Sequence, residues 1–292
     1  MNKRRLKVIV SIDGGGIRGV LPLLVLNHIN TLIIEQKISD YISNSIDLIA
    51  GTSTGAIISA GLIAKKSNKY LYTIDELLNL YKHRGPQLFN LSNPAHEKSE
   101  GLRLVLKRKF KNILLSDLDT KFAFVSFDKI ANLPFVFGRN RSSLSSIPLS
   151  TALAACSAVP GYFPSVIIDE FELIDGIMAA KNPSKIALGH TQIYFPDDVY
   201  LLLSFGTGQL EGEMYDDIEK EVDTVDTLLL NKSREDDNLI YYRFQPKISN
   251  AKPQMDNATP ENIAALIEDG IHYIEENKAL FDSLITNWKS NL

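Results

Sequence analysis

The chain has 292 residues, of which 45% are hydrophobic and 23% are charged, and its formal net charge is -4. This composition is typical of a globular protein with a full core, and the negative charge argues against broad nucleic-acid binding. The single cysteine, Cys156, excludes an internal disulfide and suits a reducing compartment. No apolar run in the sequence reaches the ~20 residues that span a bilayer, and the start resembles a signal peptide only faintly. We therefore expect a soluble, cytoplasmic protein.

Strand-like and helix-like stretches alternate along the chain. Short apolar stretches predict strands at residues 7–12, 45–50, 121–128, 133–137, 166–174 (two short strands) and 199–205. Apolar periodicity and start signals predict helices at residues 20–36, 56–64, 73–84, 101–110, 151–158, from 183 onward and at 259–291. This alternation predicts an α/β fold with a mostly parallel central sheet and helices on both of its faces.

Start signals support three of the helices. Thr73 and Glu76 have the spacing of a capping box. Ser150 is expected to cap the small-residue helix that follows it. Thr259 is expected to cap the last helix, with Pro260 in the first turn.

We expect a single domain over residues 1–292. Its motif-bearing core covers about residues 6–208. Residues 209–258 are polar and are expected to be irregular, as an insertion or a regulatory region, and residues 259–291 are expected to form a C-terminal helix. Residues 85–98 are expected to be a loop whose apolar side chains either form a lid or pack on the core.

Residues 51–55 (GTSTG) lie between a predicted strand and a predicted apolar helix. A serine at a sharp strand-to-helix turn is the nucleophile elbow of many hydrolases. The turn needs small residues two positions before and after the serine, and Gly51 and Gly55 stand there. Ser53 is therefore a candidate nucleophile, held near the positive end of a helix. The alternative is a glycine-lined turn in which Ser53 only caps the helix.

Residues 13–19 (DGGGIRG) follow a predicted strand and open a helix. Consecutive glycines let main-chain amides converge on an anion. One interpretation is a dinucleotide-binding fingerprint (GxGxxG) with Glu35 as the ribose-binding acid. The other is an oxyanion hole formed by the amides of Gly14, Gly15 and Gly16. The serine elbow on the next strand favours the second interpretation, because both turns then face one crevice at the carboxyl ends of parallel strands.

Asp175 and Gly176 end a short predicted strand, and Asp175 is the candidate general base. A serine hydroxyl is a weak nucleophile until a base takes its proton, and partial burial raises the pKa of a carboxylate toward neutral pH. The alternative for an Asp-Gly pair is a hairpin turn. Of the five histidines, only His190 fits a Ser-Asp-His order. No His, Cys or acidic residues have metal-ligand spacing, so we expect no metal or other cofactor.

Several basic residues have more than one interpretation. Arg18 either supports the glycine loop, or meets a substrate phosphate, or forms a surface ion pair. Basic spots at residues 3–7, 107–111, 139 and 141 could hold an anionic lipid surface during transient membrane contact, or could be solvated faces.

Five segments occur in an order that is characteristic of one family. They are residues 12–22 (IDGGGIRGVLP), 51–56 (GTSTGA), 152–164 (ALAACSAVPGYFP), 175–183 (DGIMAAKNP) and 203–208 (LSFGTG). Each segment alone is unspecific, but together they are highly specific. With them the sequence resembles the patatin-like phospholipases.

The resemblance implies a three-layer α/β/α fold and a serine lipid acyl hydrolase with a Ser-Asp dyad. It implies Ser53 as the nucleophile, Asp175 as its base and no metal. The implied oxyanion hole consists of Gly14, Gly15 and Gly16, and the implied supporting residues are Arg18, Gly19, Gly51, Gly55 and Gly176. The chain departs from the family's usual residues at Ile177, after the Asp-Gly pair, and at Lys181, where an asparagine is common.

Three classes of function are open at this point. The favoured one is a phospholipase A or lysophospholipase acting on glycerolipid esters. A second is a bacterial membrane-degrading phospholipase that a nucleotide second messenger switches on, with residues 209–258 as the place for such a small-molecule activator. A third, based on the glycine loop alone, is a dinucleotide-binding oxidoreductase.

Overall fold

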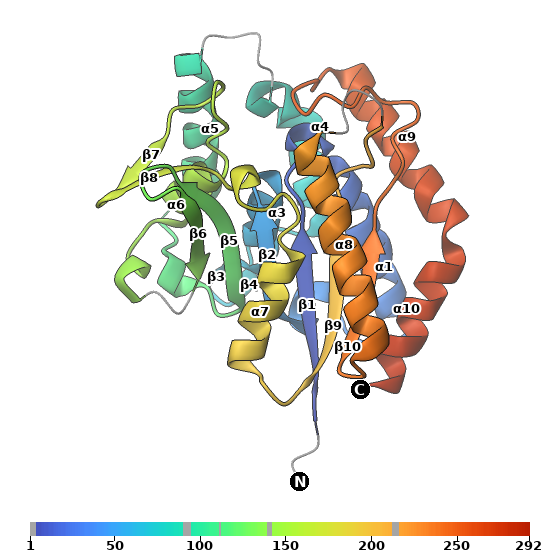
Figure 1. Ribbon diagram of the computed structural model, residues 1–292. Helices are drawn as coiled ribbons and strands as arrows, with labels where there is room; N and C mark the ends of the chain where they lie inside the picture. The colour runs from blue at the N-terminus through green and yellow to red at the C-terminus, as the bar shows by residue number, and fades with distance from the viewer. Residues whose placement is uncertain (1–3, 90–94, 111, 139–141, 212–215) are drawn as a thin grey trace.

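The computed structural model describes residues 4–89, 95–110, 112–138, 142–211 and 216–292 (Figure 1). Within these residues the chain forms a sheet of eight strands in the order β10-β9-β1-β2-β5-β8-β7, and β6 also pairs with β5. A two-stranded ribbon of β3 (Lys65–Lys66) and β4 (Lys69–Tyr70) is separate from this sheet.

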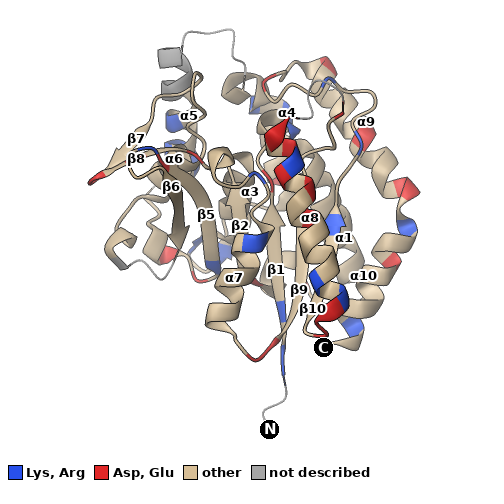
Figure 2. Cartoon of the chain, in the orientation of Figure 1, with Lys and Arg blue, Asp and Glu red and all other residues tan. Residues whose placement is uncertain are grey.

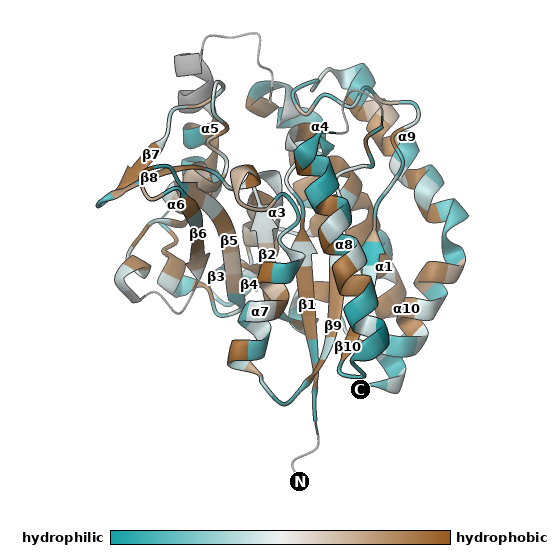
Figure 3. Cartoon of the chain, in the orientation of Figure 1, coloured by the Kyte–Doolittle hydropathy of each residue, from teal (hydrophilic) through white to brown (hydrophobic). Residues whose placement is uncertain are grey.

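The large sheet has a parallel part and an antiparallel part. The parallel strands are β1 (Leu6–Ile12), β2 (Ile46–Thr52), β5 (Lys121–Asp128), β9 (Val199–Phe205) and β10 (Leu239–Phe244). The antiparallel strands are β6 (Leu133–Gly138), β7 (Val166–Ile168) and β8 (Phe171–Asp175). The central strands β1, β2 and β9 are apolar and almost fully buried, because helices cover both faces of the sheet (Figure 3).

Helices form a layer on each face of the sheet (Figure 1). The smaller apolar core lies under α7 (Ser184–Tyr194) and α8 (Asp217–Glu235). The larger core lies under α1 (Val20–Glu35), α3 (Thr54–Ile63), α4 (Ile74–Phe89), α5 (Ala95–Phe110), α6 (Leu149–Cys156), α9 (Pro260–Glu276) and α10 (Lys278–Ser290). Short helices are η1 (Gly16–Gly19), α2 (Ile42–Ser45), η2 (Leu115–Asp117), η3 (Ser142–Leu144) and η4 (Gly176–Met178). The predicted three-layer α/β/α fold is confirmed.

The helix predicted at residues 20–36 is confirmed as α1, Val20–Glu35. With the preceding short helix it covers Gly16–Glu35, 20 residues with a hydropathy of 1.6, which is enough by length and composition to cross a membrane. In the fold, 61% of an apolar 18-residue stretch within this segment is buried inside the protein. The core helix of a globular domain has these same properties, and α1 packs here as a core helix.

Residues 209–258 are not irregular, contrary to the expectation from their polarity. Their described part contains α8, which buries Val222, Val225 and Leu229 and carries charged side chains along its length (Figure 2). It also contains β10, which pairs with β9 and completes the sheet. An amphipathic helix has a polar mean composition, so the polarity of α8 hides its periodicity.

Helix α4 begins with the predicted capping box. The Thr73 N–H donates to Glu76 Oε2 at 2.8 Å, and the Glu76 N–H donates to Thr73 Oγ1 at 3.1 Å. The helix then continues to Phe89, where the sequence predicts a loop, because Leu88 is buried in the core. The remaining lid candidate, Leu91, lies outside the described residues.

Two other helix predictions are wrong in detail. α6 is preceded by Pro148 at its cap, and Ser150 lies inside the helix. The predicted C-terminal helix is divided at Asn277 into α9 and α10. After this break α10 buries Phe281 and Trp288 in the larger core.

Candidate active site

The turn between β2 and α3 has the geometry of a nucleophile elbow. Ser53 lies between them with φ 52 and ψ -122, a strained conformation for a residue with a side chain. A Cβ at Gly51 would lie 2.3 Å from the Gly55 carbonyl oxygen, and one at Gly55 would lie 2.1 Å from the Ile12 oxygen. The two glycines are therefore required, as the spacing predicts, and they let the strand, the helix and β1 approach one another.

Strand pairing brings Ser53 close to Asp175. β2 pairs with the first part of β5 and ends at Thr52, opposite Val125. β8 pairs with the last part of β5 in the opposite direction and ends at Asp175, opposite Ser126. Because Val125 and Ser126 are consecutive, the ends of β2 and β8 meet at one point along β5.

Asp175 is completely buried at this point. Its N–H donates to the Ala158 oxygen at 3.0 Å, and its Oδ1 accepts a hydrogen bond from the Ile177 N–H at 2.8 Å. Burial raises the pKa of Asp175 to about 7, against the opposite effect of hydrogen bonds from the Ser53 side chain and the Ile177 amide. Oδ2 accepts no hydrogen bond of ordinary geometry from the described residues. Ser53 nonetheless lies near enough to Asp175 for its hydroxyl to favour the ionised carboxylate.

The glycine loop reaches the same place, but its first amide is already used. The Gly14 N–H donates to the Lys181 oxygen at 3.0 Å, and Thr207 Oγ1 donates to the Gly14 oxygen at 2.7 Å. Gly14 is therefore not an oxyanion donor, which corrects the prediction. In the described part of the chain, the amides of Gly15 and Gly16 donate to no other residue.

Gly16 turns the loop toward Ser53. Its φ is 59, and a Cβ there would lie 2.2 Å from the Met255 oxygen, the same oxygen that accepts a hydrogen bond from the Ile17 N–H at 2.9 Å. Gly16, Met255 and Ser53 all line one cavity. The loop and the nucleophile thus face the same space.

Arg18 lies beneath this loop and not on the surface. It is 3% exposed, and its Nε donates to the Gly15 oxygen at 3.4 Å. Burial lowers the pKa of Arg18, against the effect of Glu219 and Asp13, and Nη1 has no hydrogen-bond partner among the described residues. The surface ion-pair interpretation is wrong, and Arg18 is not one of the described residues that line the cavity at Ser53.

The cavity at Ser53 is mainly apolar. The described residues that line it are Gly16, Ser53, Thr54, Ile57, Phe89, Leu102, Ser157, Val159, Tyr162, Phe163, Met255 and Asp256. A second apolar cavity between α4 and α5 shares Ile57, Phe89 and Leu102 with it. Gly16 and Ser53 are predicted site residues, and Phe89 lies in the segment 85–98 whose apolar side chains are expected to form a lid or to pack on the core. The other wall residues have no predicted role. Val159, Tyr162 and Phe163 belong to a segment that carries the family resemblance, whereas Met255 and Asp256 fall in the region predicted to be irregular.

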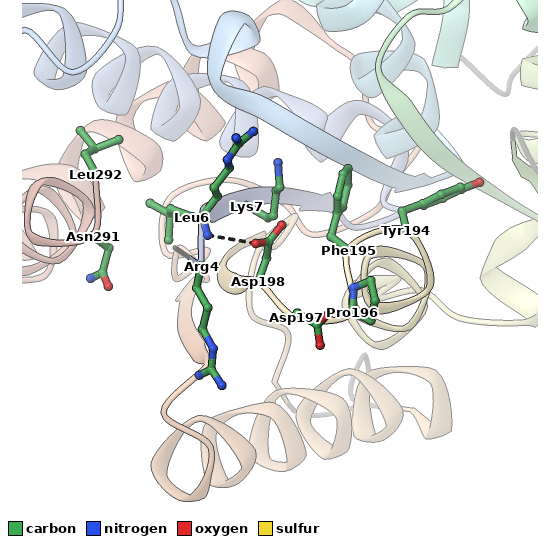
Figure 4. Close-up of a pocket in the computed structure, with 11 residues that line it drawn as sticks. Arg4, Leu6, Lys7, Tyr194, Phe195, Pro196, Asp197, Asp198, Asn291 and Leu292 are labelled. Carbon is green, nitrogen blue, oxygen red and sulfur yellow. Dashed lines mark hydrogen bonds between the residues drawn. The ribbon is translucent and has the colours of Figure 1, made fainter. Parts of the chain in front are cut away.

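A cavity larger than the one at Ser53 lies elsewhere (Figure 4). It is lined by Arg4, Arg5, Leu6, Lys7, Tyr194, Phe195, Pro196, Asp197, Asp198, Asn291 and Leu292. Leu6 begins β1, so this cavity lies at the amino-terminal edge of the parallel strands. Ser53 follows the carboxyl end of β2, and the two places are at opposite edges of the sheet.

The remaining candidates are not brought to the site. Glu35 ends α1, roughly 24 Å of helix from the glycine loop, which argues against the dinucleotide interpretation. His190 lies in α7 and is not a lining residue of the cavity.

Of the predicted basic spots, the last turn of α5 carries Lys107, Arg108 and Lys109 (Figure 2). Residues 3, 111, 139 and 141 of the basic spots lie outside the described residues. Among the described residues no group of three or more His, Cys, Asp or Glu could hold a metal.

Comparison with known proteins identifies the family of the chain. The family model for patatin-like phospholipase matches residues 10–188. The chain belongs to this family. Patatin-like protein 2 of rice (Oryza sativa subsp. indica) is 31% identical over 227 residues, which cover 66% of this chain and 54% of the relative. The chain thus spans little more than half the length of that relative.

Solved structures of the family's fold resemble the whole chain. VipD of Legionella pneumophila aligns with a TM-score of 0.51 and 13% identity, over 95% of this chain and 67% of VipD. Human GIVD cytosolic phospholipase A2 aligns with a TM-score of 0.50 and 11% identity, over 97% of this chain and 60% of the enzyme. At such identities the likeness concerns the fold.

Proposed function

We propose that the chain is a lipid acyl hydrolase of the phospholipase A or lysophospholipase type. The observation that carries the proposal is the meeting of Ser53 and Asp175 at one point along β5, beside a mainly apolar cavity. The apolar walls suit an acyl chain, and the family of the chain supports a glycerolipid ester as the substrate class.

In the proposed reaction Asp175 takes the proton of the Ser53 hydroxyl, and Oγ attacks the ester carbonyl. The Gly15 and Gly16 amides stabilise the resulting oxyanion; one such donor is typically worth ~10²–10³ in rate. Asp175 then gives its proton to the departing alcohol, which leaves an acyl-enzyme. A water then attacks the acyl carbonyl as Asp175 takes its proton; the bond to Oγ breaks, the fatty acid leaves, and Asp175 returns the proton to Ser53 Oγ.

The raised pKa of Asp175 supports its role as the base. A carboxylate near its ordinary pKa of about 4 would be a weak base at neutral pH. With a pKa of about 7, a substantial fraction of Asp175 is ionised at neutral pH, and the ionised carboxylate is basic enough to accept the proton of the serine hydroxyl. The reaction needs no metal, so we expect full activity in the presence of a strong chelator.

The protein is proposed to act from the cytoplasm through transient contact with a lipid surface. No feature of the described residues favours a nucleotide-controlled effector over an unregulated hydrolase. Hydrolysis of phospholipid vesicles without any added activator separates the two, because a nucleotide-controlled effector would be inactive under that condition.

The decisive experiment compares the wild type with Ser53→Ala on mixed phospholipids and lysophospholipids, with products identified by mass. Ser59→Ala is the matched control, because Ser59 lies in the same helix and donates only to the Ala50 oxygen. We expect fatty acid release from the wild type and the control, and none from Ser53→Ala. Substantial release by Ser53→Ala would refute the proposed function.

A further inference from the structure

Two residues that the family resemblance leaves unexplained form a buried ion pair with each other. Lys181 stands where an asparagine is common in the family, and Glu219 lies in α8, beyond the matched residues 10–188. The Lys181 ammonium donates a hydrogen bond to Glu219 Oε1. Lys181 is 2% exposed and Glu219 is 7% exposed, so the pair is desolvated on both sides.

The main chain at Lys181 supports both parts of the candidate site. The Lys181 carbonyl accepts the hydrogen bond from the Gly14 N–H at 3.0 Å. The carbonyl of the preceding residue, Ala180, accepts a hydrogen bond from Thr52 Oγ1 at 2.7 Å. Gly14 precedes the two free amides of the glycine loop, and Thr52 precedes Ser53. The ion pair thus fastens to α8 a segment that holds the oxyanion loop and the nucleophile turn together.

The charges around the pair are closely balanced. Burial lowers the pKa of Lys181, the nearby Arg18 lowers it further, and Glu219 and Asp13 act in the opposite direction. Glu219 also interacts favourably with Arg18. Without Lys181, Glu219 would attract Arg18 away from the Gly15 oxygen; without the Glu219 charge, two buried cations would repel one another. Either loss disturbs the loop.

We propose that Lys181 is a positioning residue for the reaction, acting with Glu219 to hold the Gly15 and Gly16 amides where the oxyanion forms. This inference rests on the proposed function. It also makes α8 a structural part of the catalytic centre. The pair does not contribute to the pKa of Asp175, which depends on burial, Ser53 and Ile177.

The experiment measures kcat and KM on a soluble acyl ester for Lys181→Met, Glu219→Gln and the double variant. We expect each single variant to lose about tenfold or more in kcat, by analogy with a displaced oxyanion donor. KM and the pH midpoint of activity stay unchanged. The double variant is expected to be less impaired than the product of the two losses, because it removes one buried cation and one buried anion together and so keeps the local net charge of the wild type. Lys220→Met is the matched control, since Lys220 pairs with Asp217 on the exposed side of α8.

A second measurement is independent of activity. Hydrogen exchange of the peptide that covers residues 13–19 is expected to quicken in both single variants and to stay at the wild-type rate in Lys220→Met. Wild-type kcat and unchanged exchange in folded single variants, or losses that simply multiply in the double variant, would overturn the inference. If the wild type or Ser53→Ala shows that the proposed function is wrong, the exchange data still test the positioning role.

Discussion

Arg243 donates two hydrogen bonds to the carboxylate of Asp13, from Nη1 at 3.0 Å and from Nη2 at 2.6 Å. Arg243 belongs to β10, and Asp13 opens the glycine loop after β1. Both side chains are buried, and Arg243 Nη1 also donates to Ser204 Oγ at 2.8 Å. The edge strand therefore anchors the loop on one side, while the Lys181 main chain holds it on the other.

We expect Arg243→Met to lower the free energy of unfolding by about 3–5 kcal/mol, because it leaves the Asp13 carboxylate buried without a partner. Urea denaturation measures the change. The Lys129–Glu172 pair, in which Lys129 is exposed, supplies a control: Lys129→Met is expected to change the free energy of unfolding far less than Arg243→Met. Equal decreases in the free energy of unfolding for the two variants would show that the buried Arg243–Asp13 pair stabilises the fold no more than an exposed pair does.

Activity is expected to follow the ionisation of Asp175. With a pKa of about 7, the fraction of enzyme that carries the free base falls about tenfold per pH unit below that value. We therefore expect kcat/KM on a neutral ester to rise with pH to a plateau above about 8, with a midpoint near 7. Asp175→Asn should be inactive at every pH. A midpoint near the ordinary aspartate pKa would contradict the role of burial.

Stability is expected to change with pH in the opposite direction. Folded Asp175 keeps its proton up to about pH 7, whereas an unfolded carboxyl releases it near 3.8. The folded state binds the extra proton across that window, so the contribution of Asp175 to the free energy of unfolding falls as pH rises. The slope is up to about 1.4 kcal/mol per pH unit. Denaturation of the wild type and Asp175→Asn at several pH values measures it, and a parallel pH dependence of the two would contradict it.

The backbone at Ser53 predicts an unusual order of stabilities. Both Ser53→Ala and Ser53→Gly remove the nucleophile, but only glycine adopts φ 52 without strain. We expect Ser53→Gly to be more stable than Ser53→Ala by about 1 kcal/mol. Thermal unfolding of the two inactive proteins tests this, and a more stable alanine variant would mean that the turn relaxes when the serine is replaced.

Two glycine-to-alanine changes are expected to act in opposite directions. In Gly16→Ala the new Cβ meets the Met255 oxygen at 2.2 Å on a backbone with φ 59, so both stability and activity should fall. Gly189 lies in α7 with no atom within 4 Å of its Cβ position. Gly189→Ala should therefore stabilise the protein by about 0.5–1 kcal/mol and leave activity unchanged. Thermal unfolding and ester hydrolysis of both variants check the contrast.

The parts of the site that could be predicted from the sequence are those fixed by local contacts. A Cβ at Gly51 would meet the Gly55 carbonyl oxygen four residues further along, so the spacing of these glycines carries the information about the turn, whereas the contact of Gly55 with Ile12 of β1 is not local. Asp175 could be placed at a strand end by the same kind of signal. The α/β fold followed from the alternation of apolar stretches, whose strands agree with the structure to within two residues or fewer at most ends.

The parts that could not be predicted depend on distant partners. Arg243 is 230 residues from Asp13 in the chain, and Glu219 is 38 residues from Lys181; no local pattern marks either pair. The hydrogen bond from the Gly14 N–H to the Lys181 oxygen could not be predicted either, because the two residues are far apart in the sequence. The prediction for residues 209–258 was wrong because most side chains of α8 are polar or charged, and only the few apolar residues on one face, Val222, Val225 and Leu229, are buried.

β2 and β8 pair with the same edge of β5 from opposite directions. The register of β2 on β5 therefore fixes the position of the nucleophile, and the register of β8 on β5 separately fixes the position of the base. A slip of β8 by a single step would turn the carboxylate to the opposite face of the sheet. The chemistry of the protein is therefore encoded in the alignment of a strand that contributes no reacting group of its own.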